Sequence, residues 1–256
     1  MSQEHRKNQI VQMVASMGFV SISELVELFK VTPQTIRKDL NELAKDGKLT
    51  RHHGGAGIGS STVNTNYSTR VNHGHTDKET IAQLLANDIP DGSSLFVNIG
   101  TSTEAVARAL SKKRDLRVLT NNLHVASIFS ENKNSTIIIA GGEVRQEDGG
   151  IIGGATVDLI RQFQMDYAII GVSGISSEGT LLDFDYREVR VTQAIIQNSR
   201  KVLLCADHSK FGRSAMVRLG TLDDIDDLYT NKKPSGPYCR LLEEANVGVH
   251  YPELHD

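Results

Sequence analysis

The first fifty residues carry apolar side chains at helical spacing in consecutive short segments. Between residues 6 and 17, apolar positions recur at intervals of three and four, which predicts a helix with one apolar face that Gly18 can end. A second such run covers residues 22–30. It follows Ser21, which stands three residues before Glu24, and this spacing predicts a capping box at the start of a second short helix.

A third helix is predicted to begin at Pro33, because Thr32 suits an N-cap and proline suits the first helical turn. Its Ile36, Leu40 and Leu43 fall on one face, which is predicted to be buried. The opposite face carries amides and cations that can hydrogen-bond to base edges in the major groove of DNA or to phosphates. For a single helix, a merely solvated face is the more common explanation of such a pattern. The candidate DNA-contacting residues of this segment are Thr32, Gln34, Thr35, Arg37, Lys38 and Asn41.

The segment after the third helix favours a DNA-contacting face over a merely solvated one. Residues 48–56 favour a short β-hairpin, or wing, that ends in a glycine hinge at Gly54 and Gly55. Arg51 lies where a wing contacts the phosphate backbone or the minor groove, and is a further candidate. Three helices, a tight turn and a basic wing together predict a winged helix-turn-helix, in which the third helix recognises DNA.

This module resembles a known signature. Arg6, Ile10 and Val14 stand at four-residue intervals, and a 17-residue gap separates them from the segment 32–40, TPQTIRKDL. The pattern is similar to that of DeoR-type transcriptional regulators, and the resemblance extends over essentially the whole chain. It implies a bacterial repressor that binds double-stranded operator DNA. The sign of regulation comes from the resemblance, because no residue encodes it.

A change of composition after the wing predicts the domain organisation. Residues 58–75 are rich in Gly, Ser, Thr and Asn without apolar periodicity, which suits a connector between a DNA-binding domain at 1–57 and a larger domain at 76–256. In the larger domain, helical and strand-like apolar patterns alternate, from a helix at 81–86 and a strand at 94–99 onward. Such alternation predicts an α/β fold with a parallel sheet flanked by helices.

The predicted strands end in residues suited to binding a small anion. Open α/β sheets bind ligands at the carboxyl ends of their strands. A helix that begins with small hydroxyl residues at 101–103 offers backbone N–H groups to an anion, and arginine or lysine can bind phosphate. Each turn alone can be purely conformational, but together they predict a site for a small anionic polyol. The candidates are Gly100, Thr101, Ser102, Thr103, Asn121, Gly141, Gly142, Arg145, Ser173, Asp207 and Lys210.

These turns resemble, in order, the ligand-binding turns of DeoR effector domains, whose fold is similar to that of ribose-5-phosphate isomerase and glucosamine-6-phosphate deaminase. The resemblance adds Arg70 and Lys78 as a basic pair, and implies that Asp207 and Lys210 are needed for the response to inducer. Several stretches, such as NIGTSTEAVA at 98–107, look like those of family members that respond to sn-glycerol 3-phosphate. The resemblance therefore implies that compound as effector, with another sugar phosphate as the alternative.

Because that fold also occurs in enzymes, a sugar-phosphate isomerase is the main rival. Isomerisation through an enediol needs a carboxylate base beside the reacting carbons, and the related isomerases keep an acidic loop after one strand. In this chain the corresponding strand leads into residues 171–175, without an acid before Glu178. Glu188 could occupy the position of a base, but without the loop the site is incomplete. The sequence therefore predicts a regulator with no catalytic residue.

Overall composition refines this picture in two respects. The chain has a net charge of −3, yet residues 1–57 carry eight Lys and Arg against six Asp and Glu, so the basic charge is concentrated in the DNA-binding module. No run approaches the roughly 18 apolar residues of a membrane helix, and the polar start favours a cytoplasmic protein without a secretory signal.

Cysteine and histidine spacing suggests neither a disulfide nor a metal site, so no cofactor other than the effector is expected. A single small DNA-binding module gives too little affinity and specificity alone, so a homo-oligomer, either dimer or tetramer, is expected.

Overall fold

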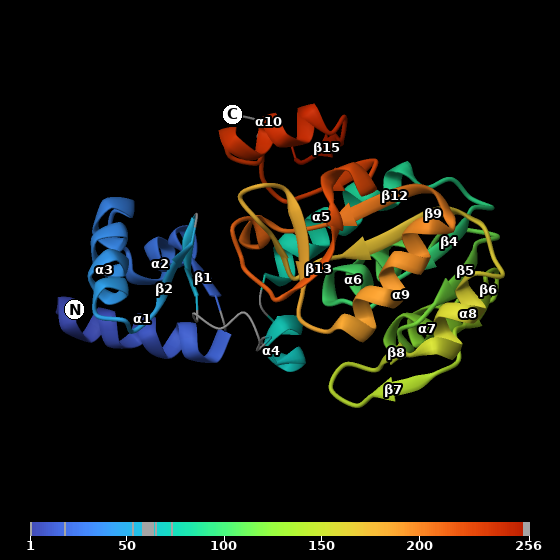
Figure 1. Cartoon of the computed structure of the whole chain (residues 1–256), viewed down its shortest axis with the longest axis horizontal. Coiled ribbons are helices and arrows are strands. Elements are labelled where there is room, and N and C mark those ends of the chain that lie inside the picture. Colours follow the sequence, from blue (N-terminus) through green and yellow to red (C-terminus); the bar gives the residue numbers. More distant parts are fainter. Residues whose placement is uncertain are drawn as a thin grey trace.

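A computed structural model describes residues 2–17, 19–52, 54–57, 64, 66–72 and 74–252. It contains a small N-terminal unit and a larger α/β unit (Figure 1). No helix in the described ranges is long and apolar enough to cross a membrane.

The N-terminal unit has the three predicted helices and the predicted wing. Its elements are α1 (Gln3–Met17), β1 (Phe19–Ser21), α2 (Ile22–Phe29), α3 (Pro33–Lys45), β2 (Thr50–His52) and β3 (Gly55–Gly57). The strands form an antiparallel sheet in the order β1-β3-β2. β1 was not predicted, because three residues are too few to give a periodic signal. The apolar faces of the helices meet in one core that includes Ile10, Leu25, Ile36, Leu40 and Leu43.

Local hydrogen bonds explain where these helices begin. The Ser21 hydroxyl accepts from the Glu24 N–H at 3.1 Å and a Glu24 carboxylate oxygen accepts from the Ser21 N–H at 2.8 Å, which confirms the predicted capping box. Thr32 caps α3 by accepting from the Thr35 N–H at 3.2 Å. The prediction of a glycine hinge after the wing was wrong. Gly54 forms the turn between β2 and β3 with φ +85°, and Gly55 belongs to β3, so these glycines make the wing's own tip.

A buried ion pair that the apolar pattern did not reveal joins α1 to α3. The Arg6 Nε lies 2.6 Å from the Asp39 Oδ2, and Asp39 is 0% exposed. The Gln3 side-chain amide donates a second hydrogen bond to Asp39 at 3.0 Å. Arg6 therefore has a structural role in this chain, since it holds the helix that carries the polar face.

The larger unit is built around a seven-stranded parallel sheet with the order β15-β14-β12-β9-β4-β5-β6. Its strands are β4 (Ser94–Val97), β5 (Arg117–Thr120), β6 (Thr136–Ile139), β9 (Met165–Gly171), β12 (Ser199–Cys205), β14 (Asp227–Tyr229) and β15 (Gly248–His250). The helices are α5 (His75–Asp88), α6 (Thr101–Leu110), α7 (Leu123–Ser130), α8 (Gly154–Ile160), α9 (Tyr186–Gln197) and α10 (Gly236–Glu244). The predicted α/β fold with a flanked parallel sheet is confirmed.

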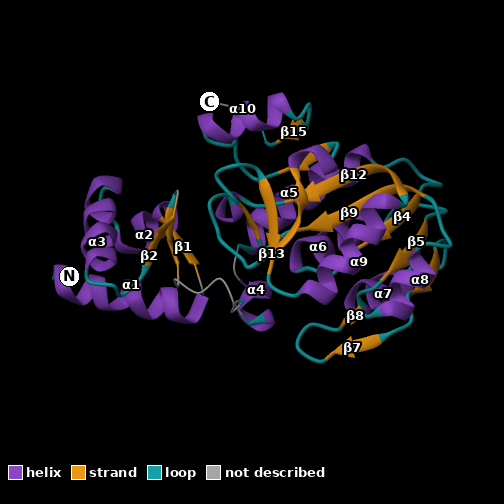
Figure 2. Cartoon of the chain, in the orientation of Figure 1, coloured by secondary structure: helices purple, strands orange, loops and turns teal. Residues whose placement is uncertain are grey.

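Helices cover both faces of this sheet (Figure 2). In β9, Ile169 packs in the apolar cluster shared with α5, α6 and α7, whereas its neighbours Ala168 and Ile170 pack in the cluster shared with α8, α9 and α10. Since both faces are covered, the ends of the strands are where a ligand can approach the sheet.

Smaller strands lie at the carboxyl edge of the main sheet. They are a hairpin of β7 (Glu143–Arg145) and β8 (Gly150–Ile152), and an antiparallel sheet of β10 (Gly174–Ile175), β11 (Thr180–Asp183) and β13 (Val217–Thr221). Short 3₁₀ turns follow at η1 (His208–Lys210) and η2 (Leu222–Asp224). These additions were not predicted from the sequence, and β11 brings Asp183 to the same edge.

The predicted connector contains more structure than its composition indicates. Residues 67–72 form α4 (Tyr67–Asn72), and α5 already begins at His75. The Tyr67 hydroxyl donates to Glu104 at 2.9 Å and its ring stacks on His124, with centroids 5.1 Å apart. α4 is thus held by tertiary contacts, which local composition does not encode. The remaining connector positions 58–63, 65 and 73, and the predicted helix stop Gly18, lie outside the described residues.

Candidate functional site

The first candidate site is the polar face of α3. Gln34, Arg37, Lys38 and Asn41 are exposed, and none of their side chains makes a hydrogen bond or ion pair within the described part of the chain. Together with Thr32 and Thr35 they line a shallow surface groove. Because α3 is capped and packed on its other side, this face is a rigid array of donors and acceptors without internal partners, which suits contact with the major groove of DNA.

The wing places Arg51 next to that face. Its Nη1 donates to the Gly55 carbonyl at 2.9 Å, so one of its donors stabilises the wing turn. Burial, together with the charge of nearby Arg37, lowers the pKa of Arg51. Two guanidinium groups therefore lie close together at the junction of α3 and the wing, where a phosphate could neutralise both.

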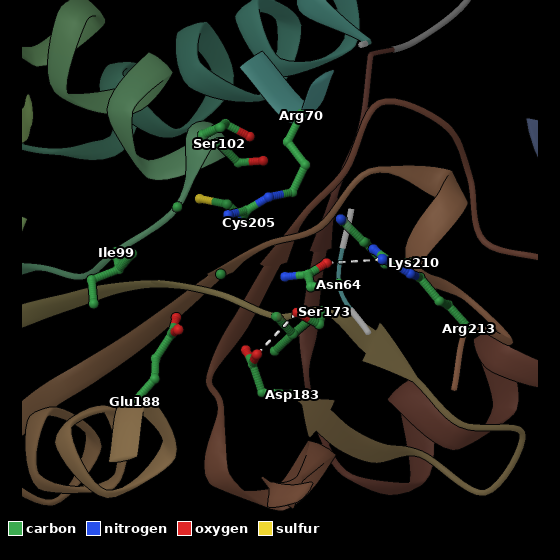
Figure 3. A pocket seen from close by; sticks show the side chains of 14 residues that line it. Asn64, Arg70, Ile99, Ser102, Ser173, Asp183, Glu188, Cys205, Lys210 and Arg213 are labelled. Carbon is green, nitrogen blue, oxygen red and sulfur yellow. Dashed lines mark hydrogen bonds between the residues drawn. The ribbon is translucent and has the colours of Figure 1, made fainter. Parts of the chain in front are cut away.

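The second candidate site is a pocket at the carboxyl edge of the parallel sheet, where β4, β9 and β12 end (Figure 3). Its polar lining includes the start of α6, the turn after β9 and the end of η1. Asn64 and Arg70 from the predicted connector complete it. Of the residues predicted to bind effector, the structure brings Arg70, Gly100, Thr101, Ser102, Ser173 and Lys210 into this pocket.

Three cations face the pocket with donors left over. The Lys210 ammonium makes no hydrogen bond or ion pair within the described residues. Burial lowers the pKa of Lys210 to about 8, although the negative charge of Asp207 raises it. Arg70 donates to Asp148 at 3.3 Å, while its Nε is buried without a partner. Arg213 donates to the Asn64 side-chain oxygen at 3.0 Å and stacks over the Phe184 ring. An incoming anion would find unsatisfied donors here.

The start of α6 adds backbone donors to the same region. Gly100 is its N-cap residue, with φ +145°, and no side chain caps the helix there. The first N–H groups of a helix lack internal partners and carry partial positive charge, so they can bind an anion. Thr101 and Ser102, which also line the pocket, present these groups.

Two carboxyl groups line the opposite part of the pocket. The Asp183 Oδ1 accepts from the Ser173 hydroxyl at 3.0 Å and from the Phe184 N–H at 2.6 Å. The Glu188 Oε2 accepts from Arg145 at 2.6 Å. Burial raises the pKa of Asp183. Burial and the charge of Asp183 raise the pKa of Glu188 to about 8, although Arg145 lowers it.

Arg145 lines an adjoining cavity and is already surrounded by acids. Its guanidinium forms a bidentate pair with Asp148, both bonds at 2.8 Å, and also contacts Asp185 at 3.1 Å and Glu188. Burial would lower the pKa of Arg145, but Asp148 and Glu188 raise it. A phosphate would have to displace these carboxylates, so Arg145 is placed to hold Glu188 rather than to bind the anion directly.

The remaining predicted effector residues do not line the pocket, and each has a structural role. The Lys78 ammonium donates to the Arg70 carbonyl, and Asp207 caps η1 and accepts from the Ser209 N–H at 2.8 Å. Burial would raise the pKa of Asp207, but the charge of Lys210 and the Ser209 hydrogen bonds lower it to about 2. These two side chains therefore support the pocket cations.

The other four predicted residues, Thr103, Asn121, Gly141 and Gly142, stabilise the conformation of turns. The Thr103 hydroxyl donates to the Asn98 carbonyl at 2.7 Å, and the Asn121 amide to the Ile151 carbonyl at 3.1 Å. The Gly141 carbonyl accepts from the Thr156 hydroxyl at 2.8 Å. Gly142 has φ +157°, and a Cβ there would lie 2.2 Å from the Thr156 Oγ1, so no larger residue fits.

Sequence reasoning missed several residues of the pocket. Asn64, Asp183, Cys205 and Arg213 were not singled out, and Glu188 was considered only as an isomerase base. Asp183 also corrects the argument that no acid follows the relevant strand closely, because the antiparallel strand β11 returns one to the site. The acidic stretch around Asp183 and the cations after η1 were visible in the sequence, but their convergence depends on long-range pairing.

Comparison with protein families assigns both units. A model described as "DeoR-like helix-turn-helix domain" matches residues 6–62, and one described as "DeoR C terminal sensor domain" matches residues 73–232. The chain belongs to the DeoR family. The resemblance inferred from the sequence is confirmed, and with it a DNA-binding transcriptional regulator that has a sensor domain for a small molecule.

Several relatives of this DeoR-family chain are named as repressors, and the match covers nearly the full length of both chains. The glycerol-3-phosphate regulon repressor of Escherichia coli (strain K12) is 51% identical over 247 residues, which cover 96% of this chain and 98% of that one. The repressor of the same name from Haemophilus influenzae is 49% identical, with 95% of each chain covered. The HTH-type transcriptional repressor CsqR of Escherichia coli is 37% identical, with 97% and 95% covered. The chain is thus a regulator, and the isomerase alternative is set aside.

Solved structures that the chain resembles in part include a ribose 5-phosphate isomerase A from Methanocaldococcus jannaschii, with 10% identity, 54% and 55% of the two chains covered and a TM-score of 0.40. A translation initiation factor eIF-2B from Pyrococcus horikoshii has 12% identity, with 90% and 82% covered and a TM-score of 0.47.

Proposed function

We propose that this DeoR-family regulator represses genes of glycerol 3-phosphate metabolism and leaves its operator when sn-glycerol 3-phosphate occupies the sensor pocket. It would act in the cytoplasm as a homo-oligomer, in which each winged helix contacts one half-site of the operator. The names of the relatives at 49–51% identity support the regulon, and the effector is the compound that the sequence resemblance implies.

The observation that carries this proposal is the composition of the pocket. It joins cations of the sensor domain, Lys210 and Arg213, to Asn64 and Arg70 of the connector. A phosphate placed between them would compete with Asn64 for Arg213 and with Asp148 for Arg70. Effector binding would therefore rearrange the contacts that hold the connector.

Such a rearrangement can lower operator affinity without any contact between effector and DNA. A shift of the connector changes how the DNA-binding units of an oligomer match the spacing of two half-sites. Couplings of this kind are typically worth about 1 to 3 kcal/mol, and they act equally in both directions. Operator DNA must then weaken effector binding by the same factor.

The proposal is tested by fluorescence anisotropy of a labelled operator fragment at fixed salt. The full chain is titrated without effector, with sn-glycerol 3-phosphate, and with a panel of pentose and hexose phosphates. Release by glycerol 3-phosphate alone supports both sensor and ligand. Release by a different phosphate alone keeps the sensor and replaces the ligand, and absence of sequence-specific binding overturns the proposal.

The substitution Lys210→Ala tests whether release from operator depends on effector binding in the pocket. Lys210→Ala removes the unpaired ammonium, so the variant should bind operator as the wild type does and no longer respond to effector. Lys232→Ala is the matched control, because it removes an exposed lysine of the same domain that does not line the pocket. A Lys210→Ala variant that is still fully released by effector would remove Lys210 from the site.

A further inference from the structure

The effector pocket has two ends of opposite character. In Figure 3, Arg70, Lys210 and Arg213 lie on its upper and right sides, whereas Asp183 and Glu188 lie below. Among the described residues, neither carboxyl forms an ion pair with any of these three cations. The pocket therefore offers separate surroundings to the two ends of a small ligand.

Each of the two carboxyl groups keeps one oxygen available. Both hydrogen bonds to Asp183 end on Oδ1, and the hydrogen bond to Glu188 ends on Oε2. The other oxygen of each group, Asp183 Oδ2 and Glu188 Oε1, has no hydrogen bond within the described part of the chain. A carboxyl oxygen without a partner accepts a hydrogen bond from a hydroxyl group and, when the group is ionised, repels an anion.

We propose that Asp183 and Glu188 select the uncharged, hydroxyl-bearing end of the effector, while its phosphate lies against Arg70, Lys210 and Arg213. The inference rests on the proposed function of this pocket as a sensor of a phosphate ester. It deepens that function, because it defines the ligand class as a phosphorylated polyol and excludes ligands with a second anionic group.

A purely structural role does not account for both acids. Arg145 is already bonded to Asp148 and Asp185, so Glu188 is not needed to neutralise it. Asp183 is 6% exposed, and a second carboxyl placed beside it opposes folding unless a ligand or a proton compensates. Two acids kept together at a ligand-accessible wall are therefore better explained by recognition of hydroxyl groups.

The same geometry distinguishes small phosphate esters from each other. sn-Glycerol 3-phosphate presents two hydroxyl donors at its second end. Dihydroxyacetone phosphate replaces one of them by a carbonyl, which only accepts, and 3-phosphoglycerate carries a carboxylate there. A site built to accept from a hydroxyl strongly disfavours analogues that lack it, because its own polar atoms then lose their partner. The expected order of affinity is glycerol 3-phosphate, then dihydroxyacetone phosphate, then 3-phosphoglycerate.

The test measures binding of these three compounds and of inorganic phosphate to the full chain by isothermal titration calorimetry. The wild type, Asp183→Asn and Glu188→Gln are compared. At pH 9, where Glu188 is ionised, the preference for glycerol 3-phosphate over 3-phosphoglycerate should fall in either variant by about tenfold or more, since the neutral amide no longer repels a carboxylate. Affinity for inorganic phosphate, which reaches only the cationic end, should not decrease.

Asp185→Asn is the matched control. Asp185 contacts Arg145 and lines the adjoining cavity, so the preference ratio should stay as in the wild type. A variant that loses affinity for inorganic phosphate and for glycerol 3-phosphate by the same factor overturns the inference. Because the wild-type order is itself a prediction, equal binding of 3-phosphoglycerate and glycerol 3-phosphate overturns it even where a variant fails to fold.

Failure of the inference and failure of the proposed function are distinguishable. If glycerol 3-phosphate releases the operator and the preference ratio is unchanged in both variants, the function stands and the selection by Asp183 and Glu188 is wrong. If the pocket binds no phosphate ester at all, both are wrong. If another phosphorylated polyol releases the operator and the ratio depends on the two acids, the ligand identity changes and the inference holds.

Discussion

On the polar face of α3, Arg37 and Lys38 are exposed and have no partner among the described residues, whereas Arg70 in the sensor pocket and Arg145 in the adjoining cavity are each bonded to a carboxylate. Water hydrates Arg37 and Lys38 in the free protein, and DNA replaces this water when it binds. The second pair is half-buried, so the protein itself must compensate its charge. Binding to DNA thus needs no internal rearrangement of α3, but an effector must exchange partners inside the pocket, and that exchange can be coupled to the connector.

The exposed face depends on a buried ion pair, so the largest effect is expected at Asp39. Asp39→Ala leaves the Arg6 guanidinium buried without its partner, which should destabilise the N-terminal unit by about 3 to 5 kcal/mol. Calorimetric unfolding of the full chain should show an earlier transition for that unit and an unchanged one for the sensor domain.

Glu42→Ala is the control for this change, because Glu42 also pairs a residue of α1 with α3 but lies at the surface. Exposed pairs contribute little, so its transitions should match those of the wild type. An Asp39→Ala variant as stable as Glu42→Ala would show that the buried pair is not needed.

The second effect concerns the exposed face itself. Lys38→Ala removes a cation that has no internal role, so operator affinity should fall about ten- to a hundredfold with no loss of stability. Anisotropy with an operator fragment measures the loss, and calorimetry should show effector affinity unchanged. Lys112→Ala, an exposed lysine of the sensor domain, is the control. Equal operator affinities of Lys38→Ala and wild type would remove Lys38 from the DNA interface.

The third effect follows from the two pocket groups whose pKa lies near 8. Burial lowers the pKa of Lys210 to about 8 and raises that of Glu188 to about 8. As the pH rises through 8, Lys210 loses its positive charge and Glu188 gains a negative one, and both changes oppose binding of an anion. Affinity for the phosphate ester should therefore fall between pH 7 and pH 9, by up to about tenfold per pH unit for each proton involved.

Lys210→Arg separates the two contributions. Arginine stays protonated over this range, so the variant should keep only the part of the decrease due to Glu188. Calorimetric titrations at pH 7, 8 and 9 provide the comparison. An affinity that rises with pH in the wild type would contradict the assignment of Lys210 to the anion end.

The two regions also differ in how far the sequence predicts them. The face of α3 follows from helical periodicity and capping, which involve neighbours in the chain, so its buried apolar positions and its exposed polar positions were predicted correctly, whereas the buried Asp39 was missed. The pocket depends on which strand ends converge. Position at a strand end predicted Lys210 and Ser173 but could not separate them from Gly142 or Thr103, whose roles depend on Thr156 and Asn98. Asp183 was missed because an antiparallel strand returns it to the edge.

The smallest effect is expected at Asn64, where the two regions are joined. Its side-chain oxygen accepts from Arg213 at 3.0 Å, and it lines the pocket from the connector. If effector binding acts through this contact, Asn64→Ala should leave operator affinity without effector nearly unchanged. It should lower the coupling by about 0.5 to 1 kcal/mol, so that effector weakens operator binding about two- to fivefold less.

Asn66→Ala tests whether that effect is specific to the contact with Arg213. Asn66 is an exposed connector residue that lines the adjoining cavity and not the effector pocket, so its substitution removes a similar side chain without touching Arg213. Operator titrations with and without effector give the coupling for each variant. A loss in Asn64→Ala alone identifies the Asn64–Arg213 contact as a link between pocket and connector. Equal losses in both variants indicate instead that coupling follows the general order of the connector, because any change that loosens it would then act alike.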